Sequence, residues 1–136
     1  MKASLCATVI IGLVCAVLPG AHALRYTVHS TPLNFYQAYH QCISNGGYLV
    51  AIETAAQNAA VVKAIKKAGG AGPWWTSGTD YGLEGAWMWL SRHHCHRRPL
   101  VSATTQEDCL SIDATGLWKD GGCFAAYPYI CEYNGH

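Results

Sequence analysis

The segment 91–99 has the most unusual composition in the chain, because it crowds basic and metal-binding residue types together. Arginine donates paired hydrogen bonds to sulfate or carboxylate groups, and histidine adds positive charge below about pH 6.5. Histidine and cysteine are also ligands for soft metals such as zinc or copper. The seven central positions of the segment hold three arginines, three histidines and one cysteine: Arg92, His93, His94, Cys95, His96, Arg97 and Arg98.

Four interpretations of this segment stay open. It is a solvated polar loop whose Cys95 is buried or capped by a small thiol, or Cys95 forms an intermolecular disulfide that builds a homodimer or joins a partner subunit. Alternatively, the histidines and Cys95 bind a metal, although adjacent residues on an extended chain point alternately, which limits how many reach one ion. In the fourth interpretation, the arginines bind anionic groups such as sulfated glycans.

The rest of the sequence excludes several classes of function. It contains no Gly-x-Ser-x-Gly, His-Glu-x-x-His or phosphate-loop motif, and no acid is evident that would orient a histidine beside Cys95. Nine Lys and Arg against eight Asp and Glu give a formal charge of +1, without the basic excess that nucleic-acid binding requires. We therefore expect a binding protein that is not an enzyme and has no nucleic-acid partner.

The N-terminal residues 1–23 have the pattern of a secretory signal peptide. Lys2 precedes an apolar run over 5–18, and Ala21-His22-Ala23 places small residues at a cleavage-site spacing. Because the run is shorter than the roughly 20 residues that cross a bilayer, we expect an extracellular protein without a membrane span. Removal of the signal leaves a single domain, 24–136, with eight charges of each sign and five cysteines.

Two helices precede a series of short strands in this domain. Asn34 and Thr54 each stand three residues before a glutamine, which is the spacing of a capping box, and pairs of glycines end both helices. The helices followed by strands predict an α+β domain with an antiparallel sheet. The predicted strands are short and rich in aromatic and branched residues: 26–28, 49–52, 74–79, 87–90, 110–112, 117–118 and 129–132. The segment 91–99 therefore falls in a loop between two strands.

This succession of elements resembles the C-type lectin domain. The resemblance covers nearly all of 24–136, and one motif, 75–80, is most similar to secreted arthropod members. Its residues in chain order are Ala38 with Cys42, 46–49, Asn58, 75–80, 84–87, 107–109, 116–120, Cys123 and 130–132. The resemblance implies a fold of two helices packed on short antiparallel sheets, with a shortened long loop. It also implies two disulfides, Cys42 with Cys131 and Cys109 with Cys123, which leaves Cys95 unpaired.

Sugar-binding members of the family hold a calcium ion through oxygen ligands, and calcium needs six to eight of them. Of five side-chain ligands that the family uses, Glu107 and Asp120 remain, whereas Arg98, Leu100 and Lys119 replace the others. We expect the carboxylates of Glu107 and Asp120 to form ion pairs with Arg98 and Lys119. They are remnants of a metal site that are not sufficient for calcium, so we expect no cofactor.

The resemblance therefore implies a secreted protein that binds an extracellular glycan without the usual calcium site. The alternative is a protein-interaction module that Cys95 assembles into a disulfide-linked homodimer or heterodimer. Relatives act in innate immunity or reproductive fluids. Trp74 and Trp89 are expected to reach the surface, while the other tryptophans stand at core positions of the family. The residues expected to contact the ligand are Trp89, Arg92, His93, His94, His96, Arg97, Arg98 and Lys119.

Overall fold

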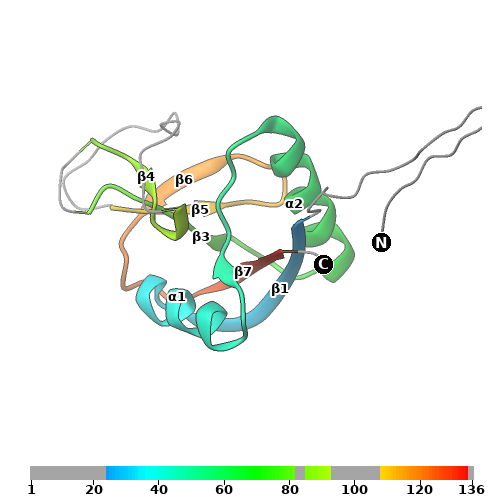
Figure 1. The fold of residues 1–136 in the computed structure, drawn as a ribbon, viewed down its shortest axis with the longest axis horizontal. Coiled ribbons are helices and arrows are strands. Elements are labelled where there is room, and N and C mark those ends of the chain that lie inside the picture. Colours follow the sequence, from blue (N-terminus) through cyan, green and yellow to red (C-terminus); the bar gives the residue numbers. More distant parts are fainter. Residues whose placement is uncertain (1–23, 82–84, 93–107, 135–136) are drawn as a thin grey trace, which may run out of the picture.

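The structure, a computed structural model, describes residues 24–81, 85–92 and 108–134. Two helices and a mixed sheet build this part of the chain (Figure 1). The elements in chain order are β1 (Leu24–Leu33), α1 (Phe35–Ser44), β2 (Tyr48–Leu49), α2 (Ala55–Ala68), β3 (Trp74–Thr79), β4 (Met88–Trp89), the 3-10 helix η1 (Leu90–Arg92), β5 (Cys109–Ile112), β6 (Trp118–Gly121) and β7 (Tyr127–Asn134). None of the helices among the described residues is long and apolar enough to cross a membrane.

Both helices begin at the predicted capping boxes. At α1, the side-chain oxygen of Asn34 accepts from the backbone N–H of Gln37 at 2.9 Å, and the side-chain oxygen of Gln37 accepts from the backbone N–H of Asn34 at 3.0 Å. Thr54 and Gln57 make the same exchange at the start of α2. These bonds satisfy backbone donors that have no partner inside a helix, which is why short polar residues mark the start of both helices.

The strands form one sheet in the order β1-β7-β3-β5-β6, with β2 paired to β7 and β4 paired to β3. All pairs are antiparallel except β3 and β7, which run parallel where Trp75 faces Tyr129. The predicted α+β fold is confirmed, but the sheet is mixed where we expected an antiparallel one. β3 and β7 lie far apart in the sequence, so they are not joined by a hairpin turn, which would require them to run antiparallel.

The central strands bury both of their faces, because neighbouring residues of a strand point to opposite sides. Trp74 and Ile130 pack with Ile65 of α2 in one core, whereas Trp75 and Tyr129 belong to a second core, which α1 covers. Figure 1 accordingly places α1 and α2 on opposite sides of the strand pair β1 and β7. The near-continuous apolar runs of β3 and β7 thus reflect two cores that share one sheet.

Two disulfides connect the elements as the resemblance implied. Cys42 of α1 is bonded to Cys131 of β7, with Cα atoms 5.4 Å apart. Cys109 at the start of β5 is bonded to Cys123 in the turn after β6, with Cα atoms 5.2 Å apart. Cys95 and most of the shortened loop lie outside the described residues.

The expected surface positions of two tryptophans are wrong. Trp74 is 1% exposed and Trp89 is fully buried, both in the core beneath α2. Trp89 also packs edge-on against the ring of Trp118, with the ring centroids 5.4 Å apart. Large aromatic side chains are normally taken into the core when tertiary packing offers the space, and in this small domain the core accommodates both of these indoles.

Candidate functional site

The strands β4 and β6, together with η1, hold the described residues that were predicted to bind ligand or metal (Figure 1). Trp89 is in β4, Arg92 ends η1, and Lys119 and Asp120 are in β6. The remaining predicted site residues lie outside the described residues: His93, His94, Cys95, His96, Arg97, Arg98 and Glu107. The described part therefore shows how the base of the predicted loop is built.

Arg92 is paired with two carboxylates from other parts of the chain. Its Nη1 lies 2.5 Å from Oε2 of Glu132, and its Nε lies 3.2 Å from Oε1 of Glu53. The other carboxylate oxygen of Glu132 accepts from the backbone N–H of Ala51 at 2.9 Å. The neighbouring Ser91 donates its hydroxyl hydrogen to the carbonyl of Leu49 at 2.5 Å. These contacts attach the start of the loop to the sheet.

Burial governs the electrostatics of this cluster. Burial on its own lowers the pKa of Arg92, but the charge of Glu132 and hydrogen bonds to both carboxylates outweigh it and raise that pKa. For Glu132, which is 2% exposed, burial raises the pKa, and the bonds from Ala51 and Arg92 only partly offset it. A buried carboxylate is stable only with such compensation, so Arg92 is the counter-ion that favours the ionised form of Glu132.

Glu53 and Glu132 are site residues that the sequence did not single out. A signal was available for Glu132, because it follows the apolar residues Ile130 and Cys131 in a predicted strand. A charged residue at such a position requires a partner of opposite charge. The sequence could not name that partner, since Arg92 is 40 residues away along the chain and comes close only in the folded domain.

Strand β6 holds Asp120, the expected remnant of a calcium site, and Lys119, and these two side chains do not pair with each other. In the antiparallel pair of β5 and β6, Asp120 lies opposite Leu110 and Lys119 lies opposite Ser111. Adjacent residues of a strand point to opposite faces, and the ion pairs among the described residues do not include one between Lys119 and Asp120. Lys119 and Asp120 therefore do not pair with each other, whereas pairing with Arg98 stays a prediction, because Arg98 lies outside the described residues. Lys119 is exposed, and Oδ2 of Asp120 is buried without a hydrogen-bond partner.

The donors available for a metal can be compared with what calcium requires. Within the described ranges, no group of three or more His, Cys, Asp or Glu side chains is placed to hold a metal ion. Asp120 is the carboxylate that β6 contributes, and its neighbour Lys119 brings a positive charge instead of a neutral oxygen. Calcium requires six to eight oxygen ligands, so the donors of the described part of the site do not fit this ion.

Comparisons with known proteins agree with this architecture. The family model for the lectin C-type domain matches residues 31–133. Bovine tetranectin is 28% identical over 109 residues, which cover 73% of this chain and 54% of that protein. Lectin subunit alpha of Sarcophaga peregrina is 30% identical over 116 residues, 74% of this chain and 41% of that protein. The chain thus spans about half the length of these relatives.

Among solved structures, human lithostathine superposes with a TM-score of 0.74 at 24% identity, covering 88% of this chain and 97% of that one. Such a likeness shows the same fold. The family match extends from the end of β1 to β7 and includes both disulfides. The chain therefore belongs to the C-type lectin domain family.

Proposed function

We propose that this protein is a secreted lectin that binds anionic glycans without calcium, through the basic segment 91–99 and Lys119. It acts by recognition and performs no catalysis. Membership of the C-type lectin domain family and similarity to a protein named as a lectin subunit support glycan binding in general terms. The observation that carries the absence of calcium is in β6, where the exposed cation Lys119 precedes Asp120 in the chain at a position where the family has a neutral oxygen ligand.

The described contacts divide the basic residues into two groups. Arg92 is held by Glu53 and Glu132, so its role is to anchor the base of the loop. Trp89 is fully buried and takes no part in ligand contact in the proposal. The cations assigned to the ligand are Lys119 and, from the sequence, His93, His94, His96, Arg97 and Arg98.

The chemistry of these groups favours sulfate or carboxylate on the glycan. Guanidinium groups donate two parallel hydrogen bonds to such anions, and salt weakens contacts of this kind wherever solvent reaches them. Histidines gain charge as the pH falls below about 6.5, which adds to the attraction. Binding therefore decreases with rising salt and increases at mildly acidic pH.

Binding of the mature protein to immobilised heparin tests this proposal. We expect affinity to fall at least about tenfold between roughly 50 and 300 mM NaCl, because binding at several anionic groups releases counterions and is therefore weakened by salt. Affinity should be higher at about pH 5.5 than at about pH 7.5 and unchanged between calcium and a chelator. The double variant Arg97→Gln/Arg98→Gln should lose most of the binding.

A matched control removes the same charge elsewhere. Lys66 and Lys67 lie at the exposed C-terminal end of α2, so Lys66→Gln/Lys67→Gln changes the net charge equally without touching the loop. Equal losses in both double variants would mean that total charge, and no particular site, attracts the glycan. A requirement for calcium would contradict the proposal directly.

A further inference from the structure

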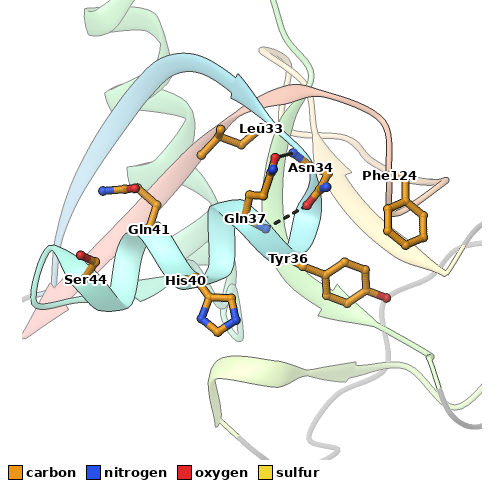
Figure 2. Close-up of a pocket in the computed structure, with 8 residues that line it drawn as sticks. All are labelled: Leu33, Asn34, Tyr36, Gln37, His40, Gln41, Ser44 and Phe124. Atoms are coloured by element: carbon orange, nitrogen blue, oxygen red, sulfur yellow. Dashed lines mark hydrogen bonds between the residues drawn. The ribbon is translucent and has the colours of Figure 1, made fainter.

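A groove of about 590 Å³ runs along the outer face of α1, and nothing in the proposal above uses it. Figure 2 shows its two ends: the rings of Tyr36 and Phe124 at one, and the polar side chains of Gln41 and Ser44 at the other. Its volume is in the range of sites that hold small ligands, about 300 to 1,000 Å³. The groove shares no residue with the segment 91–99.

Phe124 is the most exposed of the large apolar side chains in the described ranges, at 79%. It is nevertheless held in place, because the preceding Cys123 is bonded to Cys109 and its carbonyl accepts from the backbone N–H of Phe35 at 2.9 Å. The ring lies 5.5 Å from the ring of Tyr36, tilted by 49°. An apolar ring that is fixed and left in water marks a surface for contact with another molecule.

Two amide groups beside these rings present hydrogen-bond donors. The side-chain oxygens of Asn34 and Gln37 are both occupied by the capping box of α1 (Figure 2). The amide nitrogens of these two residues have no hydrogen-bond partner among the described residues. Since each oxygen is held by a backbone N–H, each NH₂ group is fixed in direction and offers only hydrogens to a ligand.

The lining of the groove selects a neutral ligand. No lysine, arginine, aspartate or glutamate of the described chain lines it, and the one basic side chain in its lining is the imidazole of His40. The ligand must combine an apolar face for the two rings with an acceptor oxygen for the fixed amides, and an amide carbonyl is a stronger acceptor than a hydroxyl. A pyranose ring with an acetamido group meets both requirements, because its C–H face is apolar and its acetamido carbonyl only accepts.

We propose that this groove binds an N-acetylhexosamine residue of a neutral glycan, with the sugar against Phe124 and Tyr36 and its acetamido oxygen accepting from Asn34 and Gln37. A second pocket of about 320 Å³ shares these two rings; its lining adds Tyr81, which is 68% exposed, and Asp108. A glycan longer than one residue thus meets further aromatic surface. This site is separate from the proposed anionic-glycan site and does not rest on it.

Two matched disaccharides test the ligand class by calorimetry or saturation-transfer NMR, in the presence of a chelator. N,N′-Diacetylchitobiose and cellobiose have the same linkage but differ in the acetamido groups. We expect the wild-type protein to bind diacetylchitobiose at least about tenfold more tightly, which is the effect of one to two hydrogen bonds. Equal affinity for the two disaccharides, or no binding at all, overturns the proposal.

Two further sets of variants test the site. Asn34→Asp with Gln37→Glu keeps both capping oxygens and replaces the NH₂ donors with acceptors, so helix stability should be retained while binding falls at least about tenfold. Phe124→Ala should also lose binding, and Phe124→Tyr should keep it. Wild-type affinity in Asn34→Asp/Gln37→Glu and in Phe124→Ala overturns the proposal.

Two more measurements distinguish a sugar site in this groove from a dimer interface and from the basic segment. If the protein is a dimer that Phe124→Ala converts to a monomer, a second copy of the chain covers the groove and the sugar proposal is wrong. Arg97→Gln/Arg98→Gln should bind diacetylchitobiose normally, so a failure of heparin binding leaves this site unaffected.

Discussion

A single arginine illustrates how folding changes the meaning of a residue. By composition, Arg92 belongs to a cluster of cations that could meet an anionic ligand. In the folded chain its guanidinium faces Glu132 and Glu53, and its side chain is 24% exposed. The charge is thus used inside the protein, where it holds a buried carboxylate in its ionised form. We consequently treat Arg92 as a structural anchor and assign ligand contact to the residues beyond it.

The variant Arg92→Met should destabilise the domain by about 2 kcal/mol at pH 7, below the range for fully buried pairs because Arg92 is partly exposed. The loss should be smaller at pH 5. The pKa of Glu132 is already raised above its ordinary value of 4.5, and without Arg92 it rises further, so this carboxyl is protonated as the pH falls. A folded-state pKa above the unfolded value favours folding at low pH and opposes it as the pH rises.

Urea unfolding of both proteins at the two pH values measures this effect, and the difference between variant and wild type removes the contribution of the histidines. The double variant Arg92→Met/Glu132→Gln should recover most of the stability, since no unpaired charge remains buried. Lys66→Met, at an exposed position of α2, is the control and should have little effect. A loss for Arg92→Met that is the same at pH 7 and pH 5 would contradict the assigned role of Glu132.

At the scale of elements, a few side chains join the helices to the sheet. Asn58 of α2 donates from its amide to the carbonyl of Gly116 at 3.3 Å and accepts from Nε1 of Trp118 at 2.9 Å. These two bonds fix β6 and its preceding turn against α2. Because β6 carries Lys119 and Asp120, the same bonds help to position these two residues.

Asn58→Ala should lower the free energy of unfolding by about 2 kcal/mol, because the indole N–H of Trp118 and the carbonyl of Gly116 both lose their partner. Asn58→Asp keeps an acceptor for Trp118 and loses only the donor to Gly116, so its cost should be about half as large. Chemical denaturation followed by tryptophan fluorescence provides both values. A larger loss in Asn58→Asp than in Asn58→Ala would show that the contact with Trp118 contributes little.

At the scale of the whole molecule, the two disulfides close loops of very different length. The Cys42–Cys131 bond spans a separation of 89 residues and joins α1 to the last strand, whereas Cys109–Cys123 spans 14 residues within one region. In the loop-entropy account these are worth about 4 to 5 and about 3 kcal/mol, a large share of the net stability of a small domain. With four cysteines paired, Cys95 is left over from the five that follow the predicted signal.

The fate of Cys95 distinguishes the alternative function, a protein-interaction module assembled by a disulfide. If that alternative holds, the mature wild-type protein migrates as a covalent dimer on a non-reducing gel, and Cys95→Ser migrates as a monomer. Under the lectin proposal we expect a monomer for both, with heparin binding retained in Cys95→Ser. A covalent wild-type dimer that fails to bind heparin would favour the alternative.

Sequence reasoning succeeded where the structural cause is local. The capping boxes at Asn34 and Thr54 were predicted correctly, because a cap depends on residues three positions apart. The strand 74–79 was also predicted with its observed bounds. The parallel pairing of β3 with β7 was not predicted, and neither was the burial of Trp89, because both depend on segments that meet only in the folded chain.

The sequence by itself determined the family, the helix starts and, through the resemblance, the disulfide pairing, and it predicts that two cations and a leucine replace calcium ligands. These depend on residue type and order, which the chain carries before it folds. Only the tertiary structure decided that Arg92 pairs with Glu132, that Lys119 and Asp120 point apart, and that Phe124 and two capping amides share a groove. Such juxtapositions join distant segments or opposite faces of a strand, and packing, not sequence order, sets those distances.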